Sequence, residues 1–222
     1  MKIKSLILGS IFALMAQVAF AQDLTPRPTA LPAPVPKIPA TPDPVAWIKV
    51  HEKKLADTSG LVERSILLRY IATAAVAAND AARAEEYANE LIETAKKLKE
   101  TPGPLRGGFG FVSEANFYGN TVLGHVAIKA NNIESAKQYL LLAGDVDGSP
   151  VLNSSGPGMS LVKLLLEKGE RDTVMKFFDQ CAKFWKNDEG RLVMWKDTVA
   201  AGHMPYFGTS ATTGMTTWRV VE

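Results

Sequence analysis

The chain contains a single cysteine, Cys181, among its 222 residues, so no internal disulfide is possible. Neither sign of charge is in excess, since 25 lysines and arginines accompany 23 aspartates and glutamates. Two of the lysines, Lys2 and Lys4, fall in a segment that we expect to be removed, which leaves 23 residues of each sign. Nucleic-acid-binding domains carry a strong basic excess. The balance therefore argues against nucleic acid as a partner.

Long hydrophobic runs and metal-binding patterns are also scarce. The longest apolar stretch covers residues 6–16, whereas a membrane-spanning helix needs about 20 apolar residues. The three histidines are scattered and show no zinc-ligand spacing. A loop starting at Asp145 resembles a calcium loop, but Pro150 and Gly156 occupy the positions that require Gly and Glu. We expect no stable membrane span after processing, no metal and no cofactor.

The first 21 residues have the features of a secretory signal peptide. Lys2 and Lys4 precede the apolar run, and Ala19 and Ala21 form a small-x-small cleavage site. We predict cleavage after Ala21 and a periplasmic or secreted protein. The alternative is an uncleaved N-terminal anchor.

Residues 22–44 hold eight of the 13 prolines. Proline fixes φ and lacks an N–H donor, so this segment cannot join a helix or a sheet ladder. We predict a disordered tether with extended polyproline-like geometry. The alternative is a ligand for a proline-binding groove.

The remainder is predicted to be all-α, with a helical domain over residues 45–203 and a C-terminal tail over 204–222. Apolar residues recur at three- and four-residue steps, and no strand-like alternation competes with them. The richest stripe comprises Val174, Phe177, Phe178, Cys181, Phe184 and Trp185. Asn79-Asp80 and Asn131-Asn132 are predicted to separate successive helices.

The helices are expected to pair as in tetratricopeptide (TPR) repeats. Leu123-Gly124, followed by Ala136, Leu140 and Ala143, has the spacing of such a repeat. Its small residues occupy equivalent positions 84, 136 and 174, and insertions around Phe109 and Asn153 lengthen the period. The predicted architecture is paired antiparallel helices in a short, irregular TPR-like α-solenoid. The alternative is an irregular helical bundle.

Residues 119–185 resemble exported bacterial TPR-like proteins of unassigned function. The resemblance rests on residues 148–154, 156–157 and 166–170, and on Phe178, Cys181, Phe184 and Trp185. It implies a helical-repeat fold and no particular chemistry.

One motif suggests an enzyme. Ser160 and Lys163 have the S-x-x-K spacing of penicillin-recognising enzymes, in which the lysine helps to activate the serine. The partner motifs are incomplete, because the next serine is Ser210 and Thr212 stands where the K-T-G motif has lysine. Cys181 is expected to be a buried core residue, and because no histidine is near it in sequence, it is not expected to be a nucleophile. A small envelope hydrolase using Ser160 and Lys163 is therefore the alternative, and no enzymatic activity is predicted.

The favoured function is an exported interaction or scaffold protein that binds a protein or peptide partner in the cell envelope. In stacked TPR pairs the first helices line a concave face that binds extended peptides. The repeat frame places Tyr118, Thr121, His125 and Lys129 on this face, with Arg69 and Lys163 at comparable places in flanking pairs. The alternative is that these are ordinary solvated side chains.

Overall fold

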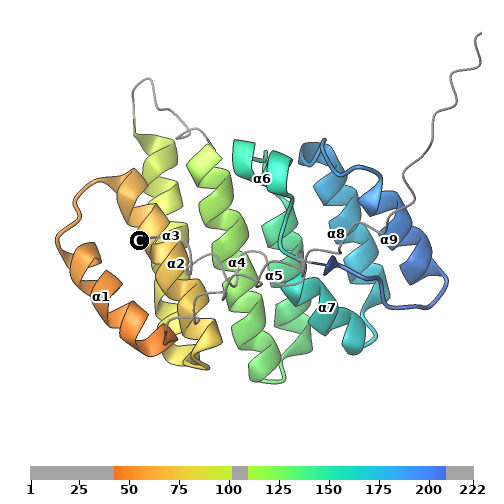
Figure 1. The fold of residues 1–222 in the computed structure, drawn as a ribbon, viewed down its shortest axis with the longest axis horizontal. Helices are drawn as coiled ribbons and strands as arrows, with labels where there is room; N and C mark the ends of the chain where they lie inside the picture. Colours follow the sequence, from red (N-terminus) through yellow and green to blue (C-terminus); the bar gives the residue numbers. More distant parts are fainter. Residues whose placement is uncertain (1–42, 102–109, 209–222) are drawn as a thin grey trace, which may run out of the picture. The chain divides into compact units, whose positions relative to one another are not determined.

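The computed structural model describes residues 43–101 and 110–208, which all belong to one compact unit. The predicted signal peptide, residues 22–42 of the predicted tether, the glycine-rich segment through Phe109 and residues 209–222 lie outside the described residues. Within the described ranges the secondary structure is entirely helical (Figure 1). The helices are α1 (Pro44–Ala56), α2 (Leu61–Ala77), α3 (Ala81–Glu100), α4 (Phe111–Lys129), α5 (Ile133–Gly144), α6 (Pro150–Ser155), α7 (Ser160–Glu167), α8 (Arg171–Phe184) and α9 (Arg191–Ala200). The prediction of an all-α fold is confirmed.

Helix α1 begins one residue earlier than the predicted domain. Asp43 accepts hydrogen bonds from the backbone N–H groups of Val45 and Ala46, and Pro44 is the first helical residue. The predicted tether included Pro44, because proline breaks helix interiors. At the first helical position proline is favoured, since its missing N–H would have no intrahelical partner.

The turn between α2 and α3 agrees with the prediction. Asn79 adopts a left-handed φ of 61°, and the Asp80 side chain accepts a hydrogen bond from the Arg83 N–H at 3.1 Å. A similar turn joins α4 to α5, where Asn132 caps the N-terminus of α5. Short turns of this kind pack each helix against the next one along the chain.

Helix α4 packs against α2, α3, α5 and α7. Two glycines allow this close packing. A Cβ at Gly119 would lie 2.7 Å from Ile92 of α3, and one at Gly124 would overlap Leu161 of α7. Because neighbours cover α4 on several sides, polar residues along this helix are buried together with apolar ones.

The apolar stripe of α8 is buried as predicted. Val174, Phe177, Phe178 and Cys181 have no solvent exposure, and the following Trp185 is also buried. Burial of Cys181 raises the pKa of its thiol well above the ordinary value, which agrees with an inert core cysteine.

Helix α6 lies in a segment that the sequence analysis assigned to an insertion. Ser149 caps this helix by accepting a hydrogen bond from the Leu152 N–H, and Pro150 occupies its first position. Six residues are too few to show helical periodicity. The sequence indicates this helix only by the Ser149-Pro150 pair, since serine is favoured as an N-cap and proline at the first helical position. After α6 the chain turns at Gly156, where a Cβ would overlap the ring of buried Trp185.

The helical domain extends beyond its predicted end at residue 203. Phe207 is buried, and its ring packs against Trp195 at a centroid distance of 5.0 Å. The Trp195 indole N–H also donates to the Tyr206 carbonyl at 3.3 Å. Pro205 and Phe207 are therefore buried with the helical domain, whereas Met204 and Tyr206 are exposed. No helix among the described residues is long and apolar enough to cross a membrane.

Candidate functional site

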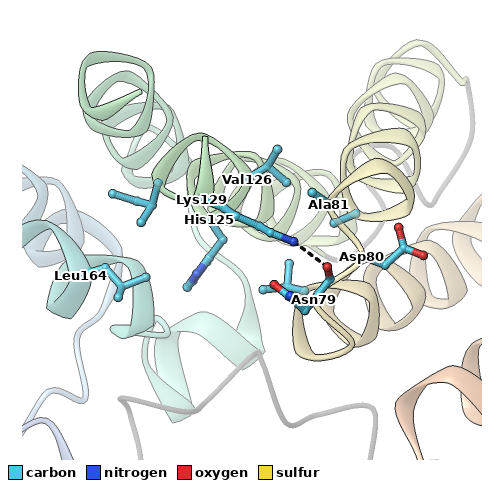
Figure 2. A pocket seen from close by; sticks show the side chains of 10 residues that line it. Asn79, Asp80, Ala81, His125, Val126, Lys129 and Leu164 are labelled. Carbon is cyan, nitrogen blue, oxygen red and sulfur yellow. Dashed lines mark hydrogen bonds between the residues drawn. The ribbon is translucent and has the colours of Figure 1, made fainter. Parts of the chain in front are cut away.

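A pocket of about 210 Å³ lies where the α2–α3 turn, α4 and α7 meet. Figure 2 shows His125 and Lys129 of α4 on one side of it, with Asn79 and Leu164 on flanking elements. Its lining residues are mostly apolar and come from four helices and one turn: Val76, Asn79, Asp80, Ala81, Ala84, His125, Val126, Ile128, Lys129 and Leu164. We call it the α2–α4–α7 pocket.

Lys129 lies at the C-terminus of α4 and reaches across to the α2–α3 turn. Its ammonium donates a hydrogen bond to the Asn79 carbonyl oxygen at 2.6 Å (Figure 2). This contact satisfies a carbonyl just beyond the end of α2, where a cation is favoured. Lys129 remains exposed, so its charge is accessible at the pocket rim.

The Asp80 carboxylate interacts with Arg83 of helix α3 rather than with Lys129. It accepts from the Arg83 N–H at 3.1 Å and forms an ion pair with the Arg83 guanidinium at 3.5 Å. In Figure 2 the Asp80 carboxylate points away from Lys129. The acidic residue nearest in sequence to the turn therefore already has a cationic partner.

His125 is half-buried in the pocket wall. Its Nε2 lies 2.9 Å from the Ser160 Oγ, across 35 positions of sequence. Burial lowers the pKa of His125 to about 4, so the imidazole is neutral at pH 7. A neutral imidazole has one N–H and one acceptor nitrogen, and its hydrogen bond to the hydroxyl holds α4 and α7 together at this end of the pocket.

Lys163 is exposed on α7, and its ammonium lies 4.0 Å from Glu167. The side-chain hydrogen bond of Ser160 connects it to His125 and not to Lys163. In this structure the Ser160 hydroxyl is hydrogen-bonded to His125. Position 163 lies one turn along α7 from Ser160, and the exposed lysine is drawn along the helix toward Glu167 instead.

Arg69 and Tyr118 lie together in a mostly buried cluster. Arg69 pairs with Glu114 at 2.6 Å and donates to the Tyr70 hydroxyl at 2.9 Å. Its guanidinium also lies 4.9 Å from the centroid of the Tyr118 ring. Burial raises the pKa of Tyr118, so the phenol stays neutral. These contacts join α2 to α4 through a paired charge.

The predicted exposure of Tyr118 and Thr121 is wrong. Tyr118 is 4% exposed and Thr121 is 6% exposed, and the Thr121 hydroxyl donates to the Phe117 carbonyl at 2.8 Å. The reason is that α2, α3, α5 and α7 all pack on α4, which leaves most of its N-terminal half buried. Of the six predicted site residues, only His125 and Lys129 line the α2–α4–α7 pocket.

A second hollow, of about 720 Å³, is polar and carries both signs of charge. Lys99 and Lys183 line it together with Asp145 and Asp147. Because two lysines and two aspartates line this hollow, its lining favours neither an anionic nor a cationic ligand. Across residues 43–101 and 110–208, no group of three or more His, Cys, Asp or Glu side chains could hold a metal ion.

Asn79, Ala81 and Leu164 were not predicted as site residues. The sequence indicated only that Asn79 belongs to a turn and that Leu164 belongs to a helix. The pocket arises because α7 lies beside α4, which no local pattern shows. The Ser160–His125 contact has the same origin.

Comparison with known proteins identifies no relative of this chain. No protein-family model matches the chain, and the curated proteins and solved structures that we searched contain no significant match. No family membership is therefore shown, and the resemblance to exported TPR-like proteins stays a prediction.

Proposed function

We propose that the protein is an exported interaction module that binds a protein or peptide partner at the α2–α4–α7 pocket. One observation carries this proposal: a largely apolar pocket, with an accessible cation at its rim, lies where the α2–α3 turn, α4 and α7 meet. Apolar pockets with a few polar groups are typical binding sites for a partner's side chain or a small ligand. We propose that the protein is exported and cleaved after Ala21. The intact mass of the protein recovered outside the cytoplasm tests this step, because the mature chain should begin at Gln22.

The proposed architecture is a short TPR-like array of the pairs α2/α3, α4/α5 and α7/α8. The buried small or β-branched residues Ala84, Ala136 and Val174 occupy equivalent places in the second helix of each pair. Gly124 supports the array, since its lack of a side chain lets α4 approach Leu161 of α7. In such an array the first helices α2, α4 and α7 share one face, and all three contribute to the pocket.

A pocket-filling substitution tests the proposed function. Ala81 lines the pocket, whereas the adjacent Ala82 is exposed and does not line it. Partners captured from an envelope extract by the wild-type protein would be identified by mass spectrometry. We expect Ala81→Leu to weaken capture of a specific partner at least fivefold, while Ala82→Leu leaves it unchanged. Equal capture by both variants, with unchanged helical circular dichroism, would contradict binding at this pocket.

Hydrolysis at Ser160 is a second candidate function, favoured by the hydrogen bond between Ser160 and His125. In this hypothesis the neutral imidazole would accept the serine proton, as in nucleophile–base pairs. Wild-type protein should then be labelled by a fluorophosphonate at Ser160, and Ser160→Ala should not be labelled. His125→Gln should lose labelling with its helical content intact. The interaction function predicts no labelling of any of the three proteins.

A further inference from the structure

We infer that the second hollow, of about 720 Å³, binds a small zwitterion that carries a primary ammonium group and an oxyanion on one short chain. The oxyanion lies at the N-terminus of α4, and the ammonium lies beside Asp145 and Asp147. This is a second site, independent of the function proposed for the α2–α4–α7 pocket. The two sites lie at opposite ends of α4, because Asn116 and His125 are about 14 Å apart along the helix axis.

Close backbone packing holds the walls of the hollow together. Its lining comes from the last turn of α3, the first turns of α4, the loop between α5 and α6, and the last turn of α8. Gly110, at the start of α4, packs so closely on Ser149 that a Cβ there would overlap it. A Cβ at Gly148 would lie 2.6 Å from the Phe184 Cβ. The loop therefore contacts both helices, and the hollow is formed before a ligand binds.

Four charged side chains line the hollow without pairing with one another. Lys99 and Lys183 lie at the ends of α3 and α8, whereas Asp145 and Asp147 lie in the loop after α5. None of the ion pairs within residues 43–101 and 110–208 includes any of these four residues. A ligand with both signs of charge can pair with both sets, which a ligand of one sign cannot do.

The N-terminus of α4 is the place for the oxyanion. Helix N-termini favour negative charge, since their first N–H groups have no intrahelical acceptor. No side chain caps α4 at Gly110. Ser113, in the first turn, lines the hollow and is 8% exposed, and its hydroxyl has no hydrogen-bond partner among the described residues. A buried hydroxyl without a partner is costly, so an acceptor on the ligand would stabilise this wall.

The loop after α5 is the place for the ammonium. Asp145 directly follows the last residue of α5, and Asp147 is two positions further along the chain. The C-terminus of a helix carries partial negative charge, which adds to that of the two carboxylates. A primary ammonium has three N–H donors, so it can bond both carboxylates at once. A quaternary ammonium has no N–H donor, and the site therefore favours a primary amine.

The test uses the purified full chain with two zwitterions, 2-aminoethyl phosphate and β-alanine. Each is compared with its amine-free analogue, ethyl phosphate or propionate, and with ethanolamine, which lacks the oxyanion. Binding is followed by NMR shifts of Val112, Asn116 and Val146. At least one zwitterion should bind about two- to fivefold more tightly than its single-charge analogues, the factor expected of one additional exposed ion pair. The tighter zwitterion identifies the oxyanion as phosphate or carboxylate.

Substitutions separate the two ends of the ligand. Asp147→Asn should remove most of the zwitterion's advantage without weakening the amine-free analogue. Lys183→Met should weaken both, whereas the matched control Lys176→Met, also exposed on α8 but outside the hollow, should weaken neither. Ser113→Ala should weaken both and keep the fold, because it removes a hydroxyl that has no partner among the described residues.

Each contrary outcome overturns the inference in a different way. Equal affinity of both zwitterions and their amine-free analogues would show an anion site alone, and equal affinity of the zwitterions and ethanolamine an acidic site alone. Shifts that persist unchanged in both Lys183→Met and Asp147→Asn would place the ligand elsewhere. No shift with any probe would refute the site. Ala81→Leu, which fills the other pocket, should leave these shifts unchanged, so the proposed function stands or fails separately.

Discussion

At the scale of single residues, Gly156 is a position at which the backbone tolerates little change. Its φ of 78° and ψ of 166° fall in a region that is essentially restricted to glycine. A Cβ would also overlap the ring of Trp185, which is 1% exposed and cannot move aside. We expect Gly156→Ala to lower the free energy of unfolding by about 3 kcal/mol, from backbone strain and overpacking together. Urea denaturation monitored by circular dichroism measures this loss.

Gly169 provides the matched control. It also has a positive φ, of 87°, but a Cβ there would meet no atom within 4 Å. Gly169→Ala should therefore show only the backbone cost, about 1–2 kcal/mol. If Gly156→Ala lowers the free energy of unfolding by no more than Gly169→Ala does, then contact with Trp185 does not restrict the residue at position 156.

His125 should make stability depend on pH. Burial lowers its folded pKa to about 4, whereas a histidine in the unfolded chain titrates near 6.5. Between these values the unfolded chain binds more protons, so stability is retained above pH 6.5 and lost as pH falls toward 4. The loss should approach about 3 kcal/mol, because each pKa unit corresponds to about 1.4 kcal/mol.

The His125→Gln variant isolates this effect from other groups. His51 also has a pKa lowered by burial, and carboxylates titrate in the same range, so wild-type data alone would mix several contributions. The difference in unfolding free energy between wild type and His125→Gln should shrink from pH 7 to pH 4. A difference that stays constant over this range would show that His125 is solvated in the folded protein.

Residue patterns predicted the core more fully than the candidate site. The stripe through Phe177 and Cys181 appeared directly in the spacing, since a helix with one buried face repeats every three to four residues. The repeat frame predicted that Tyr118 and Thr121 lie on the concave face of the array. They are buried because α4 has neighbours on several sides, which an amphipathic pattern cannot represent.

The site itself depends on contacts between residues far apart in sequence. Lys129 bonds Asn79 across 50 positions, Arg69 pairs with Glu114 across 45, and His125 bonds Ser160 across 35. Among the arguments from sequence, only the repeat frame predicted that any of these helices lie side by side. His125 and Lys129 both line the pocket because they lie in the C-terminal part of α4, beside the turn that precedes α3.

At the scale of elements, the segment over residues 204–208, which follows α9, should be required for stability. Phe207 buries its ring against Trp195, and the Tyr206 carbonyl accepts the Trp195 indole N–H. A chain ending at residue 203 loses both contacts. We expect it to be less stable than a chain ending at residue 208 by about 1.5–3 kcal/mol, the value of burying one large apolar side chain.

Truncation at the N-terminal end provides a comparison with the C-terminal truncation, because it should leave stability unchanged. A protein starting at Asp43 keeps the side chain that caps α1 and every described helix. Its melting temperature should match that of the chain starting at Gln22, because the predicted tether is expected to add no core contacts. A fall of more than a few degrees would contradict the tether prediction. Equal stability of chains ending at 203 and 208 would contradict the role given to Phe207.

At the scale of the whole molecule, an array and a bundle differ in how stability is distributed. In an array of stacked pairs each part touches mainly its neighbours, so terminal helices open before central ones. Helix α4 packs against α2, α3, α5 and α7. By comparison, the main contacts of α1 are with α2, and those of α9 are with α8. The array therefore places the most protected amides in α4 and the least protected in α1 and α9.

Native-state hydrogen exchange measures this distribution directly. Amides of α4 should exchange only through global unfolding, while those of α1 and α9 should exchange at least tenfold faster, since opening an end leaves the remaining contacts intact. The Gly156→Ala variant sharpens the test. It should accelerate exchange in α8 and α9, which pack around Trp185 and Trp195, more than in α2 and α3. Uniform acceleration of all helices would show one cooperative bundle and would contradict the TPR-like array.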